Sequence, residues 1–203
     1  MSSAHEEGWE AIQGTYAMTA SGNCLWSTDG FNVPPYPLYT SPSAYAAHFT
    51  AHGTWTFHKH GKGTAHYIQV GLTSPPIAGN PNPNFVSASS VEFLFTFTYV
   101  VEDGMITVSM DPIPLADFHY PFVKYHAKFL TGPKVLSATY WLIDRFTFVG
   151  RISSDHKTIL LNSGENLDNP EAAALEVQTF HFSDGSKCYG LCNSGRVLTR
   201  MSE

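Results

Sequence analysis

A strict alternation of apolar and polar residues constrains the fold of this chain more than any other feature. From Val91 to Val101 every odd position is apolar or aromatic, while the even positions include Glu92 and Thr96. A period of two, built from aromatic and β-branched residues, predicts a strand that buries one face. Asp103-Gly104 follows and leads into a second β-rich run, Met105–Met110, so a tight hairpin is expected there.

The same order of a β-rich run, a turn and a second β-rich run recurs along the chain. The further pairs are Thr54–His58 with Thr64–Val70, Tyr140–Ile152 with Thr158–Leu161, and Val177–Phe182 with Lys187–Leu191. An up-and-down meander of about eight antiparallel strands is the simplest arrangement of these hairpins. We therefore predict an all-β protein.

Helical signals are confined to two short segments. Pro42–Ala51 and Pro170–Val177 are each expected to form one or two helical turns, too short to cover a sheet face. The 203 residues, 43% of them hydrophobic, are enough for one core and too few for two full domains. We expect a single domain over residues 1–203, with residues 1–8 as a flexible tail.

The polar faces of the expected strands favour a closed barrel. They carry Tyr, His and Thr where an open sheet would show Lys and Glu, and charged residues make up only 14% of the chain. A closed antiparallel barrel has no edge strands, and at about eight strands its interior is filled by side chains or holds one small ligand. A two-sheet sandwich would show the same alternation and is the alternative.

The two ends of the chain resemble a known kind of barrel. Gly14-Thr15-Tyr16 opens the first strand after a lead that contains Trp9, and Arg196 and Arg200 lie in the last strand. This resembles the Gly-x-Trp opening and late basic residue of the lipocalin-like calycins, with Tyr16 where a Trp is usual. The size and hairpin order are also similar to allene-oxide-cyclase-like barrels. The resemblance implies an eight-stranded barrel with an apolar cavity for a hydrophobic small molecule, used for transport in some members and for isomerisation, cyclisation or decarboxylation in others.

The charge balance argues against several kinds of partner. A net charge of −6 with 11 Lys and Arg provides no basic stripe for nucleic acid or an anionic membrane. No apolar run reaches the roughly 18 residues of a membrane helix, and the start MSSAHEEGWEA lacks the apolar stretch of a secretion signal. We expect a cytoplasmic protein with a small hydrophobic ligand, and a homodimer is compatible with the sequence.

Neither the cysteines nor the histidines predict a cofactor. Three cysteines do not make a disulfide framework, and Cys188 and Cys192 lack C-x-x-C spacing, so buried reduced thiols are expected. Five of the ten histidines fall within residues 48–66, but no acidic residue lies between Asp29 and Glu92 to join them as metal ligands. Phosphate-binding loops and the nucleophile-elbow motif are also lacking, so we expect no metal or nucleotide cofactor.

Candidate acid and base groups come from two segments. Alternation places His119 and Tyr125 on one strand face if Pro121 does not break the register. A histidine there can shuttle a proton, and a tyrosine hydroxyl can stabilise an enolate-like oxygen. Asp144 and Arg145 are adjacent within the apolar run Thr139–Gly150, so one of them faces the interior. That residue is a structural ion-pair partner, a buried acid or an anion-binding guanidinium. For the histidines, too, a structural role is the alternative.

These observations lead to one functional prediction with two alternatives. The prediction is a cofactor-independent barrel isomerase or cyclase acting on a polyketide- or terpene-like molecule, with His119, Tyr125 and Asp144 as its catalytic groups. The residues expected to line its pocket are Tyr16, Trp55, Phe95, Tyr99, Trp141 and Arg145. The alternatives are a non-catalytic carrier of the same ligand class and a structural or interaction barrel with a filled interior.

Overall fold

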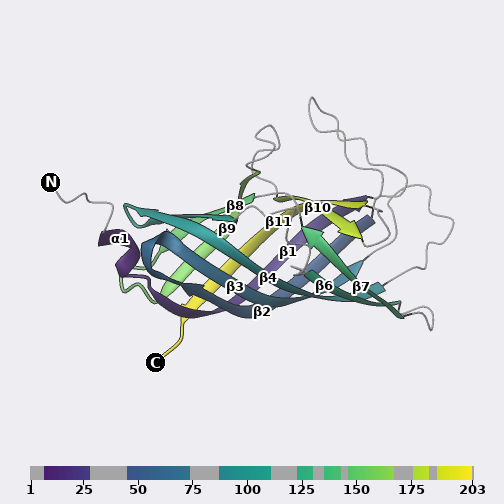
Figure 1. Cartoon of the computed structure of the whole chain (residues 1–203), viewed down its shortest axis with the longest axis horizontal. Helices are drawn as coiled ribbons and strands as arrows, with labels where there is room; N and C mark the ends of the chain where they lie inside the picture. The colour runs from purple at the N-terminus through teal and green to yellow at the C-terminus, as the bar shows by residue number, and fades with distance from the viewer. Residues whose placement is uncertain are drawn as a thin grey trace.

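The computed structural model describes residues 7–27, 45–73, 87–110, 123–129, 135–142, 146–166, 176–182 and 187–202. Within these ranges the chain forms one short helix, one 3-10 turn and eleven antiparallel strands (Figure 1). The helix α1 spans Glu7–Glu10 and the 3-10 turn η1 spans Lys59–Gly61. The strands are β1 (Gly14–Ser27), β2 (Tyr45–Phe57), β3 (Lys62–Thr73), β4 (Ser87–Glu102), β5 (Met105–Met110), β6 (Val123–Phe129), β7 (Val135–Leu142), β8 (Phe146–Ile152), β9 (Thr158–Asn166), β10 (Glu176–Phe182) and β11 (Lys187–Arg200).

The sheet closes on itself through strands that are interrupted halfway along the barrel. β5 pairs with residues 97–102 of β4 and β6 with residues 87–93, so β5 and β6 are two halves of one long strand. β8 and β7 are the two halves of the next long strand, because β8 pairs with β5 and β7 pairs with β6. β9 and β10 are the two halves of the one after, because β9 pairs with β8 and β10 pairs with β7. β11 pairs with both β9 and β10 and then with β1. The protein is therefore an eight-stranded, closed, antiparallel up-and-down barrel, which confirms the predicted fold class.

The strand register shows how the barrel closes. If one starts at Arg196 and steps each time to the residue directly opposite on the next strand, the path through β1, β2 and β3 reaches Val91 on β4. Following them the other way, through β9, β8 and β5, leads to Val101, ten residues further along the same strand. Such a stagger goes with strands inclined by about 35–45° to the barrel axis. Because ten is even, positions that face the interior still do so after a full circuit.

A two-residue hairpin joins β4 to β5 where the sequence predicts one. Asp103 and Gly104 have φ of 50° and 72°. Positive φ at both central residues defines the type I′ turn, whose twist matches that of the flanking strands and which Asp-Gly favours. Short hairpins also join β2 to β3 and β8 to β9 at this end of the barrel, next to α1.

The helical turn expected at Pro42–Ala51 is wrong for the described part of that segment. Residues 45–51 begin β2 and pair with both β1 and β3. Ala47, Phe49 and Ala51 are buried, while His48 and Thr50 between them are exposed. Burial of one face against the barrel interior outweighs the helix preference of alanine. In the second segment Glu176 and Val177 belong to β10, and residues 170–175 lie outside the described part.

An aromatic core fills the α1 end of the barrel. Trp55 contacts four phenylalanine rings at centroid distances of 5.0–6.5 Å: Phe57, Phe95, Phe97 and Phe148. Ile12, in the segment between α1 and β1, is fully buried in the same cluster. This end is therefore closed by side chains, whereas β6, β7 and β10 complete the wall of the opposite half together with the long strands β1, β2, β3, β4 and β11 (Figure 1). We call this opposite half the far half.

Candidate ligand-binding site

The inner wall changes character between the two ends of the barrel. At the α1 end the buried inward side chains are mostly large, as the aromatic core shows. In the far half, most of the described inward positions are small: Gly22, Cys24, Ala47, Gly71, Gly190 and Cys192. The larger residues described there are Trp26 and Phe49, and also Val91 and Phe93 on the part of β4 that pairs with β6. An eight-stranded barrel of this kind is just wide enough for large side chains to fill, so small ones fill less of it. The side chains of β6, β7 and β10 lie outside the described part of the chain.

The rings of Phe49 and Trp26 lie against the barrel wall. A Cβ atom added at Gly22 would come within 2.6 Å of the Phe49 ring, and one added at Gly190 within 2.6 Å of the Trp26 ring. Only glycine permits so close an approach of ring and backbone. A ring held against the wall in this way occupies less of the centre of the lumen than one directed toward the axis.

A buried arginine lies between the aromatic core and the far half. Arg196 is only 4% exposed and comes from β11, between Leu198 of the aromatic core and Cys192 of the far half. Its guanidinium carbon lies 3.8 Å from the centroid of the Phe148 ring, the geometry of a cation–π contact. Its Nη1 donates a hydrogen bond of 2.5 Å to Oγ of Ser194. These contacts offset part of the cost of burying a charge.

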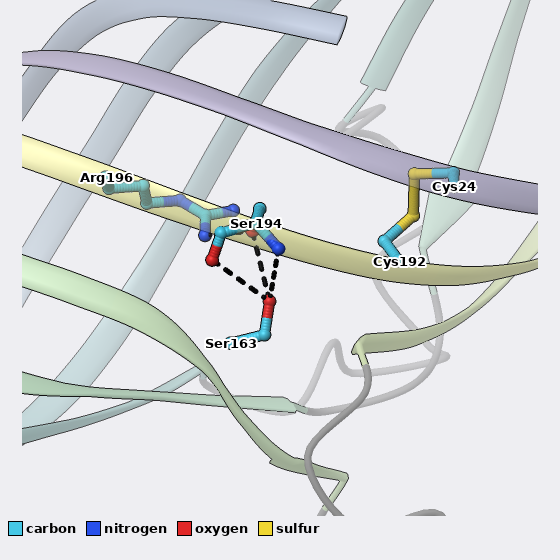
Figure 2. Close-up of a disulfide and its surroundings, with 5 residues drawn as sticks. All are labelled: Cys24, Ser163, Cys192, Ser194 and Arg196. Carbon is cyan, nitrogen blue, oxygen red and sulfur yellow. Dashed lines mark hydrogen bonds between the residues drawn. A yellow bond between two sulfur atoms is a disulfide. The ribbon is translucent and has the colours of Figure 1, made fainter. Parts of the chain in front are cut away.

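Two serines continue the polar contacts of Arg196 to the neighbouring strand β9. The backbone N–H of Ser194 donates to Oγ of Ser163 on β9 at 2.8 Å, and the two hydroxyl oxygens are 3.2 Å apart. Figure 2 shows Arg196, Ser194 and Ser163 together beside the Cys24–Cys192 pair. A band of polar groups thus borders the far half on the side of the aromatic core. We call Arg196, Ser194 and Ser163 the polar cluster.

A disulfide joins Cys24 to Cys192, so the expectation of reduced thiols is wrong for these two residues. They stand opposite each other in the pairing of β1 with β11, with Cα atoms 4.1 Å apart, and both are buried. The two cysteines are 168 residues apart in sequence and become neighbours only when the barrel closes. The side chain of Cys188 lies outside the described part of the chain.

Four of the residues expected to line the pocket lie in the aromatic core at the α1 end, where they are at most 4% exposed: Tyr16, Trp55, Phe95 and Tyr99. The Tyr16 hydroxyl donates to the His156 carbonyl at 3.0 Å, and the Tyr99 hydroxyl donates to the His58 carbonyl at 2.8 Å. Each bond attaches a hairpin to the barrel interior.

Burial holds both of these hydroxyls in the protonated form. Burial and, to a smaller extent, the neighbouring Tyr16 together raise the pKa of Tyr99 to about 12. Burial also raises the pKa of Tyr16, against the opposing effect of Arg200. Both tyrosines are therefore hydrogen-bond donors at neutral pH, and their part in ligand binding stays a prediction.

The expected catalytic residues are not brought together within the described part of the chain. His119, Asp144 and Arg145 lie outside it. The backbone of Tyr125 lies in β6, in register with Val91, and that of Trp141 lies in β7, in register with His181. The roles assigned to these residues from the sequence stay predictions.

The start of β1 is fastened to the end of β11. Tyr16 and Arg200 stand opposite each other, and the guanidinium carbon of Arg200 lies 5.9 Å from the centroid of the Tyr16 ring. Arg200 also donates hydrogen bonds to the carbonyls of Ala11, at 3.3 Å, and Gln13. The two sequence features that carry the calycin resemblance, the Gly14-Thr15-Tyr16 opening and a late arginine, are thus in direct contact.

The outer wall carries a histidine–carboxylate pair. Nε2 of His66 lies 2.9 Å from Oε1 of Glu92, and both side chains are exposed, so the pair contributes at most about 1 kcal/mol to stability. Among the residues that the structure describes, no three His, Cys, Asp or Glu side chains gather closely enough to hold a metal ion.

Within the same described ranges, none of the helices has the length and apolar character needed to cross a membrane. The fold is that of a closed eight-stranded barrel. No known protein family matches the chain, and no curated protein matches it significantly in sequence.

Proposed function

We propose that this protein is a small-molecule-binding barrel of calycin type that holds one hydrophobic ligand in the far half of its lumen. The contrast within the inner wall carries the proposal: large aromatic side chains fill the α1 end, and mostly small ones line the described far half. A barrel of eight strands accommodates either a filled core or one small ligand. Here the filled core occupies the α1 end, and the far half is the proposed ligand space. The contact of Tyr16 with Arg200 supports the calycin relationship.

The proposal has a catalytic form and a carrier form. In the catalytic form the lumen excludes water and fixes the reactive conformer of a polyketide- or terpene-like molecule for isomerisation or cyclisation. His119, Tyr125 and Asp144 would then move protons or polarise the substrate. In the carrier form the same molecule is bound and released unchanged. A barrel filled from end to end receives less support, because most described inward positions of the far half are Gly, Ala or Cys.

Filling the far half provides a direct test of ligand binding. Ala47 faces the lumen, so Ala47→Phe adds a ring to the proposed binding space; Ala17, exposed on the outer face of β1, gives the matched control Ala17→Phe. Native mass spectrometry of the freshly purified proteins, with extraction of any bound molecule, is the measurement. We expect wild type and Ala17→Phe to retain an organic ligand and Ala47→Phe to lose it while keeping its β-sheet circular dichroism. Equal ligand occupancy in Ala47→Phe would place the ligand elsewhere.

The extracted molecule then separates the two forms. Incubated with an excess of the protein, it is converted in the catalytic form and recovered unchanged in the carrier form. Loss of conversion in His119→Ala, Tyr125→Phe or Asp144→Asn, with binding retained, would assign the chemistry to those residues. Unchanged turnover in all three would show that this assignment is wrong.

The cytoplasmic location and the freedom from nucleic acid and membrane partners stay predictions, as does a homodimer. The disulfide provides a test of the cytoplasmic location. Disulfides persist mainly in oxidising compartments, and cytosolic ones are mostly transient. If the protein works in the cytoplasm, Cys24 and Cys192 are expected as thiols in living cells. Both are buried, so the cells are quenched with acid to stop thiol exchange, and a maleimide is added after the chain has been denatured. Protection of both cysteines from labelling would indicate an oxidising compartment.

A further inference from the structure

An exposed apolar patch covers part of the outer wall of the barrel. Its members lie on the outward faces of β3 and β4 and are 38–54% exposed: Ile68, Val70, Leu72 and Leu94. The strands β2, β3 and β4 run side by side in this part of the wall (Figure 1). Outward residues of a strand that faces water are normally polar, and apolar residues that gather on a surface mark an interaction site. We call these four residues the apolar patch.

The surface around the apolar patch carries little charge. On the described outward faces of β2, β3 and β4, Lys, Arg, Asp and Glu occupy three positions: Lys62 and Glu102 near the α1 end, and Glu92. The outward face of β2 beside the patch consists of threonines and histidines: His48, Thr50, His52 and Thr54. Although the whole chain has a net charge of −6, two copies could meet through this face with few like charges brought together.

We propose that a second copy of this chain covers the apolar patch, related to the first by a two-fold axis that runs along β3. The two outer walls would pack face to face with their strands nearly aligned, as in a β-sandwich. Rotation about this axis leaves each cross-strand row of residues at the same height and exchanges the strands on either side of β3. Ile68, Val70 and Leu72 then pack against the same residues of the other copy, and β2 of each copy faces β4 of the other.

The strand register adds a complementary polar contact to this arrangement. His52, Ile68 and Glu92 form one row across β2, β3 and β4. In the two-fold dimer, His52 of each copy therefore faces Glu92 of the other. Glu92 also contacts His66 of its own chain at 2.9 Å, and a carboxylate accepts hydrogen bonds from more than one donor. A polar contact thus flanks the apolar centre on both sides of the axis.

The face is large enough for a stable dimer. Strands lie about 4.8 Å apart and an outward residue recurs about every 6.8 Å, so each outward position covers about 33 Å² of wall. The strands β2, β3 and β4 each present six such positions within residues 46–56, 62–72 and 88–98. Together they provide roughly 600 Å² per copy, or roughly 1,200 Å² in total, where stable interfaces begin. We expect a dissociation constant of about 10 μM or lower.

The opposite wall of the barrel is less suited to self-association and supplies the control. Leu160 lies on β9, four strands from β3 around the barrel, and is 50% exposed against 53% for Leu72. Arg151 stands directly opposite Leu160 in the strand register. A dimer through that wall would bring two arginines into the interface, and removing a charge from water is costly.

Sedimentation equilibrium of the full chain tests the proposal. The wild type is expected to approach twice the 22.3 kDa of one chain as its concentration rises through the dissociation constant. Leu72→Lys should weaken association by about a hundredfold or more, because the two-fold axis brings the two added charges together. Leu160→Lys adds the same charge to an equally exposed leucine and should associate like the wild type.

A mixture of two variants tests the axis and shows that the variants fold. Leu72→Lys and Leu72→Glu each bring like charges together on self-association, whereas a pair of one with the other brings opposite charges together. We expect each variant alone to be a monomer and an equimolar mixture to form a heterodimer. A mixture that stays monomeric would overturn the two-fold arrangement.

Three further results would overturn the proposal. A wild type that stays monomeric at about 100 μM, tenfold above the expected dissociation constant, would leave the apolar patch to a different partner. A dimer that is lost in Leu160→Lys and kept in Leu72→Lys would place the interface on the opposite wall. Assemblies that keep growing beyond a dimer would show that the contact is not closed by a two-fold axis. Ligand retention in the lumen is measured separately, so none of these results decides the proposed function.

Discussion

Removal of the Cys24–Cys192 disulfide is expected to lower the free energy of unfolding by several kcal/mol. The bond joins residues 168 positions apart, so it holds nearly the whole chain in one loop when the protein unfolds. The entropy removed from the unfolded chain grows with the logarithm of loop length, and for this loop it is about 17 cal/mol/K, or about 5 kcal/mol at 25 °C. Folded domains are typically stable by only about 5–15 kcal/mol, so the loss would be a large part of the total.

Urea unfolding followed by tryptophan fluorescence measures this contribution. The oxidised and the dithiothreitol-reduced wild type have the same atoms apart from two hydrogens, so their difference isolates the cross-link. The double variant Cys24→Ala/Cys192→Ala is expected to lose somewhat more, because it also removes two buried sulfur atoms. Cys188→Ala leaves the cross-link in place and serves as the control. On heating, a loss of this size corresponds to a Tm lower by roughly 10–20 °C.

One result would refute the reasoning. If mass spectrometry confirmed the bond in the oxidised protein, and reduction changed the free energy of unfolding by less than about 1 kcal/mol, the loop-entropy argument would fail. That result would mean that β1 and β11 stay close together in the unfolded chain, so that the bond restricts little.

Two further predictions concern buried aromatic residues. The indole N–H of Trp55 is buried and has no hydrogen-bond partner among the described residues, so Trp55→Phe, which removes it, is expected to cost under about 1.5 kcal/mol. Trp55→Ala is expected to lower the free energy of unfolding by about 3–5 kcal/mol in the same urea assay. Equal losses for Trp55→Phe and Trp55→Ala would contradict this account. Because the pKa of Tyr99 is raised from 10.0 to about 12, its contribution is complete below pH 10 and is lost as the pH rises through 12. The free energy of unfolding of the wild type is therefore expected to decline between pH 10 and about pH 12. Tyr99→Phe should show a smaller decline over this pH range, and a decline identical to wild type would contradict the assignment.

The barrel was predictable because its strands alternate. Val91–Val101 buries one face along its whole length in β4, and Asp103-Gly104 forms the expected turn. Prediction was less successful where local sequence and burial disagree. Pro42–Ala51 contains four alanines that favour a helix, and only its two neighbouring strands make residues 45–51 extended. Tyr140–Ile152 was expected as one strand and is divided between β7 and β8 on either side of residues 143–145.

The polar cluster and the disulfide could not be predicted from local patterns. The inward face of β11 carries Cys192, Ser194, Arg196 and Leu198, a mixture that does not show which face is buried. Only the pairing of β11 with β1 and β9 decides that Arg196 faces the lumen and that Cys192 meets Cys24. Four of the aromatic residues expected in the pocket are interior: Tyr16, Trp55, Phe95 and Tyr99. Sequence alone does not say which end of a barrel each one occupies, and the side chain of Trp141 lies outside the described part.

The closing of β1 against β11 also has a consequence for biosynthesis. Among the described strands of the barrel, β1 emerges from the ribosome first, and β11, which covers its second edge, emerges after the others. At roughly 5–20 residues per second, the 168 residues between the two cysteines take roughly 10–30 s to make. Gly14–Ser27 contains no charged residue to discourage pairing with another chain during that interval. A nascent chain of this protein therefore has to protect an open, uncharged strand edge until β11 has been made.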